Sequence, residues 1–199
     1  MCWSATVSLN TFIFSFFGTV FALANGVVSI ESSLYILSFI SMQLLEYFTW
    51  KNIDNASMIR LLSQVGTLII LSQVPLAINR DSTLRNKSLW YLAFACVTLA
   101  MFATTKVKYS MHRAPNGHLA WDWLSSWPKW YVAFWALCCI AVLVHMKRYG
   151  TCAFFMCTLV LSYYTYSSSG TWGSMWCWVS NFLALWWIAQ VFYKDVCIS

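Results

Sequence analysis

Long apolar runs separated by short polar stretches make up most of this chain. A helix that crosses a bilayer needs about 20 apolar residues at a rise of 1.5 Å each, and most of these runs approach that length. Backbone groups must be hydrogen-bonded within lipid, and a β-barrel would show short alternating segments, so the runs predict helices. Seven membrane-spanning helices are predicted, over residues 5–23, 27–50, 58–78, 88–105, 130–146, 151–166 and 172–193.

Composition supports the same fold class. Of 199 residues, 60% are hydrophobic and only 9% are charged, whereas soluble domains carry about 25% charged residues. A water-soluble globule and a disordered chain are both excluded. The net charge of +6 is spread along the chain and marks no nucleic-acid surface. We therefore expect an all-α, seven-helix transmembrane bundle that forms a single polytopic membrane domain over residues 1–199, with the lipid bilayer as its first partner.

The predicted helices define two sides of the membrane. Side A holds the connections 51–57, 106–129 and 167–171, whereas side B holds the connections 79–87 and 147–150 and the C-terminus. Lys and Arg in the connecting segments set the orientation of most membrane proteins. Here the twelve Lys and Arg residues divide six and six between the two sides, so no orientation is predicted.

The connection 106–129 is much longer than the others. Within it Leu119, Trp123 and Trp127 recur every four residues, as on one face of a helix. Because tryptophan favours the headgroup zone, one interpretation is a short interfacial helix lying on the membrane surface. The other interpretation is a tryptophan-rich loop packed on the helix ends, and the sequence favours neither.

Motifs of known chemistry are not found in the chain. It has no Thr-Val-Gly-Tyr-Gly filter, no phosphate-binding glycine loop, no His-Glu-x-x-His and no Gly-x-Ser-x-Gly. Most of its eight cysteines fall within predicted helices, with no Cys-x-x-Cys pair and no histidine at ligand spacing, which favours free, inert thiols. We therefore expect no catalytic activity, no cofactor and no metal site.

Polar side chains inside the predicted helices are the most informative feature. Gln43, Glu46 and Trp50 share one face of the second helix, at i, i+3 and i+7. A carboxylate near the bilayer centre costs about 2.5–3.5 kcal/mol on insertion scales, so Glu46 should face protein or water. Arg60 lies at a similar depth on the neighbouring helix and is predicted to be its counter-ion.

The same depth argument extends this polar group toward the membrane centre. Gln64 lies one turn beyond Arg60 and is predicted to hydrogen-bond Gln43, while Asn181 on the last helix comes near the midplane. On the side B half, the pair Glu31 and His145 forms a weaker counterpart. The predicted intramembrane polar layer is Gln43, Glu46, Arg60, Gln64 and Asn181, with Gln73, Trp176 and Cys177 as secondary positions.

Such a layer has two physical uses. It holds helices together through interhelical hydrogen bonds of roughly 0.6–2 kcal/mol each, which is the structural interpretation. Alternatively it binds an ion, a proton or a small polar solute in a cavity, and a third helix interrupted at Pro75 would supply free carbonyl groups.

Three segments carry a resemblance to a known family. The segments are Met42-Gln-Leu-Leu-Glu46-Tyr-Phe-Thr-Trp50, Gln73-Val-Pro75, and Gly173-Ser-Met-Trp-Cys177 with Asn181. They resemble an uncharacterised family of short multi-span membrane proteins of large DNA viruses of algae and protists. That family has no assigned activity, so no residue role carries over. The resemblance implies a viral origin and location in a virion internal membrane or a host membrane.

A second similarity is to the seven-helix sugar transporters, which are built as three plus one plus three helices. Trp176, Asn181 and Gln190-Val-Phe-Tyr193 are similar to their last helix, although the repeat and the paired prolines of that family do not occur here. A span count alone is an analogy of fold.

The sequence therefore predicts a multi-pass viral membrane protein with a mainly structural or membrane-organising role. The alternative is a small-solute, ion or proton transporter or channel that uses the polar layer. Beyond the lipid, a second copy of the chain and a virion protein are candidate partners, and the alternative adds a small solute or ion.

Overall fold

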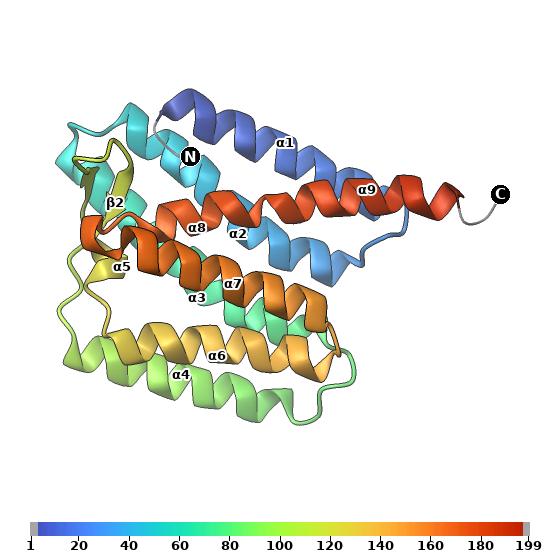
Figure 1. Ribbon diagram of the computed structural model, residues 1–199. Helices are drawn as coiled ribbons and strands as arrows, with labels where there is room; N and C mark the ends of the chain where they lie inside the picture. Colours follow the sequence, from blue (N-terminus) through green and yellow to red (C-terminus); the bar gives the residue numbers. More distant parts are fainter. Residues whose placement is uncertain (1–3, 197–199) are drawn as a thin grey trace.

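The long helices of this protein lie side by side and run between two ends of the molecule (Figure 1). The computed structural model describes residues 4–196. Its helices are α1 (Ala5–Ala24), α2 (Ile30–Lys51), α3 (Ala56–Arg80), α4 (Lys87–Thr104), α5 (Asp122–Ser125), α6 (Lys129–His145), α7 (Tyr149–Tyr166), α8 (Trp172–Ser180) and α9 (Phe182–Val196), with a 3-10 turn at Ser167–Ser169 and strands β1 (Met111–Arg113) and β2 (Leu119–Trp121).

Local sequence explains where the first helices begin. The side chains of Ser4, Ser29 and Asn55 accept hydrogen bonds from backbone N–H groups in the first turns of α1, α2 and α3. The tight connection between α1 and α2 uses Gly26, whose φ of 66° favours glycine. Polar N-caps and a glycine turn therefore start the first three helices close to the positions that the sequence predicts.

Helices occupy the positions of the predicted membrane segments. Four segments are long and apolar enough to cross a bilayer: α1, α3, α4 and the α8–α9 stretch Trp172–Tyr193. The helix α6 is apolar but has 17 residues, whereas α2 and α7 reach 18 residues or more but are less apolar. The last predicted helix is interrupted at Asn181, which separates α8 from α9.

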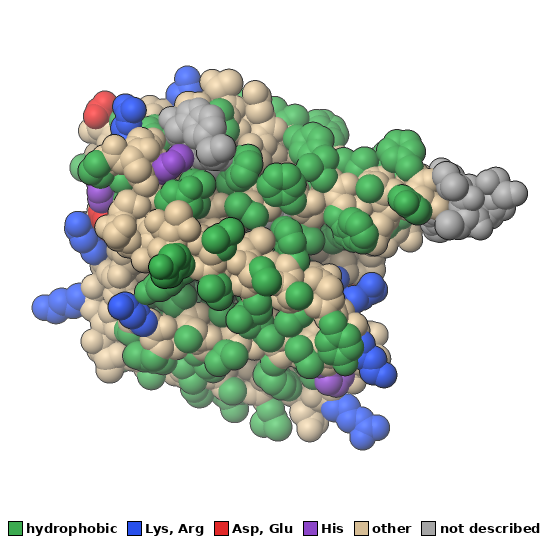
Figure 2. All heavy atoms as spheres, in the orientation of Figure 1, with side chains coloured by type: hydrophobic (Ala, Val, Ile, Leu, Met, Phe, Trp, Pro, Cys, Tyr) green, Lys and Arg blue, Asp and Glu red, His purple; other side chains and the backbone are tan. Residues whose placement is uncertain are grey.

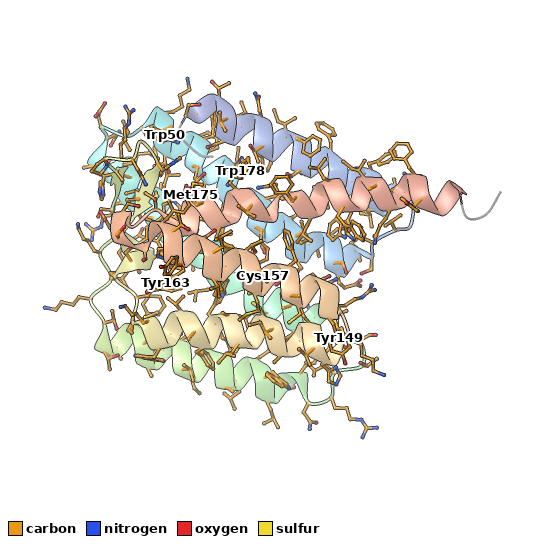
Figure 3. The ribbon with its side chains drawn as sticks, in the orientation of Figure 1. Trp50, Tyr149, Cys157, Tyr163, Met175 and Trp178 are labelled. Atoms are coloured by element: carbon orange, nitrogen blue, oxygen red, sulfur yellow. The ribbon has the colours of Figure 1, made fainter. Side chains whose placement is uncertain are left out.

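Charge and apolar surface are segregated along the helix axes. Figure 2 shows hydrophobic side chains over the middle of the molecule and charged or histidine side chains gathered at its two ends. Figure 3 places Trp50 and Met175 toward side A, at the left, and Tyr149 at side B, at the right. An apolar belt between two charged ends is what a bilayer requires of a protein that spans it.

Small residues allow the N-terminal helices to pack closely. The pairs α1–α2 and α2–α3 make the most extensive helix contacts. The buried face of α1 carries Ser15, Gly18 and Ala22, and that of α3 carries Ser63 and Gly66. In lipid the hydrophobic effect does not drive helices together, so close approach over small residues supplies much of the attraction. Among the long helices α2 is consequently the most enclosed, with twelve of its 22 residues buried.

The connection between α4 and α6 is not the predicted surface helix. Residues 111–113 and 119–121 form an antiparallel hairpin in which Met111 pairs with Trp121, and only the four residues of α5 are helical. Leu119, Trp123 and Trp127 are buried at 0%, 0% and 4% exposure. The interfacial-helix interpretation is therefore wrong and the packed-loop interpretation is confirmed, because strand pairing satisfies the backbone while the indoles fill space between helices.

Candidate functional site

The polar side chains of α2 that the sequence singled out face the interior. Gln43 and Glu46 both have an exposed fraction of 0%, so no water-sized space touches either side chain. Cys177 on α8 is also fully buried and lies within electrostatic range of Glu46. The α2–α8 contact therefore brings together three of the predicted positions in a closely packed setting.

The predicted contribution of α3 to this group is wrong. Arg60 and Gln64 are exposed, and neither the ion pair with Glu46 nor the hydrogen bond with Gln43 is formed. The buried face of α3 instead includes Ile59 and Ser63. Each residue turns a helix by about 100°, so the neighbouring positions 60 and 64 point away from α2. Close packing over small residues therefore determines which face of α3 is buried, and charge pairing does not.

The remaining predicted amides are buried in different places. Asn181 lies at the α8–α9 junction, where its Nδ2 donates to the carbonyl oxygens of Cys177 at 2.8 Å and Trp178 at 3.2 Å. Gln73 on α3 is fully buried, and its amide makes no hydrogen bond with the described residues. Neither amide joins Gln43 through a hydrogen bond between described residues, so the predicted layer does not form one network.

Trp176 connects four helices. Its ring centroid lies 5.4 Å from that of Phe39 on α2, 5.5 Å from that of Trp135 on α6 and 5.1 Å from that of Phe155 on α7, each in an edge-to-face arrangement. Its Nε1 donates to the Thr158 hydroxyl at 3.2 Å. Edge-to-face aromatic pairs are worth about 0.5–1.5 kcal/mol each beyond their buried area. The role of Trp176, a secondary position of the predicted layer, is therefore to pack α8 against α2, α6 and α7.

The hairpin and α5 form a cap that closes side A; we call residues 111–127 the tryptophan cap. Trp121 and Trp123 stack with their ring centroids 5.4 Å apart. A Cβ added at Gly173 would lie 2.8 Å from Cε3 of Trp121, and one added at Gly66 would lie 2.9 Å from Cζ2 of Trp123. The two glycines thus make room for the two indoles, which seat the cap on α8 and α3.

The tryptophan cap covers the end of the polar face of α2. The Thr49 hydroxyl lies 3.8 Å from the sulfur of Met111, one turn beyond Glu46. On the outer side of the cap, the Asp122 carboxylate accepts a hydrogen bond from Ser110 at 2.6 Å and lies 3.4 Å from Lys108 Nζ. Burial alone would raise the pKa of Asp122, but the Ser110 bond and the charges of His112 and Lys108 lower it.

Side B carries an acid–base pair that sequence reasoning assigned wrongly. His145 Nδ1 hydrogen-bonds the Asp81 carboxylate, whereas its predicted partner Glu31 is exposed. Thr83 also donates to Asp81, through its N–H at 2.9 Å and its hydroxyl at 2.7 Å. Burial opposes ionisation of Asp81, but the Thr83 and His145 hydrogen bonds outweigh it and lower the pKa of this carboxyl.

Arg80, next to Asp81, is a second feature that the sequence analysis missed. Its Nε donates to the Ser32 hydroxyl at 2.9 Å, and its guanidinium carbon lies 5.7 Å from the centre of the Tyr35 ring. An arginine beside an aspartate at the end of a predicted span was visible in the sequence, but its contacts with α2 depend on tertiary packing.

Side chains that commonly bind metals do not gather in threes among the described residues. No group of three His, Cys, Asp or Glu side chains comes together within residues 4–196.

Comparison with known proteins found no family model, no curated protein and no solved structure that matches this chain.

Proposed function

We propose that this protein is a multi-pass integral membrane protein in which α1, α2, α3, α4, α6, α7 and the α8–α9 pair each cross the bilayer. The apolar belt between two charged ends supports this topology (Figure 2). The 17 residues of α6 and the 18 of α7 extend about 26–27 Å, close to the ~30 Å hydrocarbon thickness. The polar character of α2 is compatible with a span because Gln43, Glu46 and Thr49 face protein, and the exposed Glu31 and Lys51 lie at the two ends of the helix.

Accessibility of engineered cysteines tests the topology. Seven crossings place Asp54→Cys, Arg113→Cys and Ser168→Cys on one side of the membrane, and Asn25→Cys, Arg85→Cys and Arg148→Cys on the other. An impermeant maleimide added to sealed vesicles of one orientation should label only one of the two sets. Labelling of two positions joined by one helix from the same side would overturn that crossing.

We further propose that the role of the protein is structural or membrane-organising. The observation that carries this proposal is the complete burial of Gln43 and Glu46, which leaves no water-sized space beside them. A conduction or transport site must admit water or solute to its ionisable group. Closely packed polar side chains instead favour one arrangement of helices over others, and the tryptophan cap closes the same region from side A.

The variant Glu46→Gln tests this role, with Glu31→Gln as its matched control because Glu31 lies on the same helix but is exposed. We expect Glu46→Gln to change folding yield and melting temperature much more than Glu31→Gln, which removes only an exposed carboxylate in the first turn of α2. Vesicles containing either variant or the wild-type chain should be as impermeable to protons and small ions as vesicles without protein. Wild-type flux that Glu46→Gln abolishes in a folded protein would instead establish the transport alternative.

The viral resemblance supports a location for this role. A virion internal membrane or a host membrane is the membrane that we propose. Fractionation of infected cells and purified virions with an antibody against the chain tests this location, and recovery only from membranes of uninfected cells would overturn it.

A further inference from the structure

An amide lies near the middle of the exposed face of α1. That face repeats every three or four residues, over Asn10, Ile13, Phe17, Val20 and Ala24. Phe17, two helical turns beyond Asn10, is the most exposed large apolar residue of α1. Asn10 is therefore the one polar member of an otherwise apolar row.

The side chain of Asn10 has no hydrogen-bond partner among residues 4–196, whereas other polar side chains of α1 do. The hydroxyls of Thr11 and Thr19 each donate to the carbonyl oxygen four residues earlier, at 2.8 Å. An amide without a partner is costly in hydrocarbon, because lipid tails neither donate nor accept hydrogen bonds. The exposed face of α1 is therefore incomplete in a single copy of the chain.

The packing of α1 on α9 gives the depth of Asn10. A Cβ added at Gly18 would lie 3.5 Å from Cβ of Ala184 and 2.9 Å from Cδ1 of Ile188. Both helices run from side A to side B, so Asn10 lies near the level of Trp178, with which it lines a hollow. Trp178 lies six residues, about 9 Å, beyond the start of α8. The short side chain of Asn10 therefore cannot reach the headgroups of side A.

The hollow beside Asn10 leaves room for a neighbouring helix. It has a volume of about 290 Å³ and lies between α1 and the junction of α8 and α9. Phe14, Phe182 and Leu185 line it, and each is nearly half exposed, so the hollow is open to the surroundings of the molecule. Figure 1 shows α1 at one edge of the helices, where another molecule can lie against it.

We propose that the exposed face of α1 binds the same face of a second copy of this chain. Two copies with one orientation in a bilayer are related by a two-fold axis along the membrane normal, so identical residues lie at identical depth. Asn10 of one copy then meets Asn10 of the other. Each amide donates through Nδ2 and accepts through Oδ1, so the pair is self-complementary. The inference rests on the proposed function, because it requires α1 to cross the bilayer.

The apolar remainder of the row supports a second copy as the occupant. Residues spaced alternately by three and four are those that two helices bring together along a shared seam, and one asparagine in such a seam specifies the register of the pair. A lipid tail would cover the apolar residues but would leave the amide of Asn10 without a partner.

Gln64 on α3 provides the rival interface, because its amide is also exposed. It lies one turn from the exposed Arg60, whose charge favours the headgroup level of side A. Helix side chains tilt toward the N-terminus, which for α3 is at side A, and the longer side chain of Gln64 reaches further in that direction. The helix α1 has no charged residue, so Asn10 depends more on a partner.

Cysteine cross-linking of the full-length protein in vesicles tests which face pairs. Phe17 and Leu68 are 65% and 66% exposed, and each lies twelve residues beyond the first residue of its helix, α1 or α3. Mild oxidation of Phe17→Cys should give a covalent dimer above the background from the native cysteines of the wild-type chain. Leu68→Cys should give no more than that background. Equal yields from the two variants, or a dimer from Leu68→Cys alone, would overturn the inference.

The dimer dissociation constant tests the role of the amide. Energy transfer between donor-labelled and acceptor-labelled copies in vesicles measures it over a range of protein-to-lipid ratios. Asn10→Leu should weaken the dimer about tenfold, the effect of losing hydrogen bonds between membrane helices. Asn10→Gln keeps an amide and should weaken it less, whereas Gln64→Leu should leave it unchanged.

Melting temperature in detergent checks that each variant is folded. A wild-type chain that stays monomeric at every ratio, or a folded Asn10→Leu variant that dimerises as the wild type does, would overturn the inference. The accessibility pattern of the engineered cysteines remains alternating if only the dimer fails, and it changes if the membrane topology fails.

Discussion

The two ends of this molecule use aromatic and charged side chains in opposite ways. At side A, the tryptophan cap presses its indoles onto glycines of α3 and α8 and closes the interior. In the side B half, aromatic side chains line a small cavity of about 40 Å³, and Arg80, Asp81 and His145 lie around the helix ends. The same residue types therefore fill one end and border a small cavity near the other, and the difference depends on what each aromatic ring packs against.

The largest expected effect is at the glycine under the cap. In Gly173→Ala the added Cβ would lie 2.7 Å from Cδ2 of Leu124 and 2.8 Å from Cε3 of Trp121, so either the cap or α8 must shift. We expect a loss of about 1–3 kcal/mol of stability, the usual cost of overpacking. Thermal unfolding in detergent, followed by tryptophan fluorescence, measures it.

Gly150→Ala is the control at the other end. Gly150 lies in the first turn of α7, and apart from its chain neighbours and its own helix backbone no atom comes within 4 Å of an added Cβ. Because glycine weakens a helix relative to alanine, this variant should stabilise the protein by up to about 0.5–1 kcal/mol. Equal destabilisation by the two variants would remove the contrast between the packed glycine under the cap and the unpacked glycine at side B.

The next effect is the acid dependence of stability at side B. Because the pKa of Asp81 is lowered in the folded protein, its stabilising contribution is complete above the ordinary aspartate pKa of about 4 and is lost as the pH falls through the lowered value. Asp81→Asn should cost about 1–3 kcal/mol at neutral pH and weaken the acid dependence of the melting temperature.

Asp122→Asn at side A provides the comparison. The pKa of Asp122 is also lowered, but its partners Lys108 and His112 are exposed, so this pair is screened by water. We expect a loss below about 1 kcal/mol and a smaller change in the acid profile. A larger loss from Asp122→Asn than from Asp81→Asn would contradict the expectation that the carboxylate with exposed partners contributes less.

The smallest effect is expected at Gln73. Its amide is fully buried and makes no hydrogen bond with the described residues, so Gln73→Met removes polar atoms that gain nothing from folding. Stability should stay within about 1 kcal/mol of the wild type or rise, because replacing an unsatisfied polar group by an apolar one of similar size is neutral or favourable. A loss well beyond this range in chemical unfolding would reveal an interaction of the Gln73 amide that matters.

Helix positions were predictable because the bilayer imposes a length and an apolar composition on each segment. The sequence-based ranges 58–78 and 130–146 lie within a few residues of α3 and α6, with the polar cap Asn55 at the start of α3 and Pro128 before α6. The burial of Gln43 and Glu46 was also predictable, because a carboxylate in an apolar helix must face protein or water.

The faces of the helices were not predictable from charge. Arg60 was the nearest cation to Glu46 by depth, but α3 turns Ser63 and Gly66 to its neighbours because small residues permit the closest approach. The hairpin 111–121 was missed because helical spacing of Leu119, Trp123 and Trp127 also fits a packed loop. Short-range sequence patterns do not predict which side chain fills which space in the folded interior.

The sequence by itself determined that the chain is helical, apolar and suited to a membrane, because each of these properties belongs to a segment taken alone. Only the tertiary structure decided that His145 pairs with Asp81, that Gly66 and Gly173 receive the cap, and that Arg80 borders an aromatic pocket. Each of these contacts joins residues far apart along the chain, and its geometry is set by how closely the intervening helices pack.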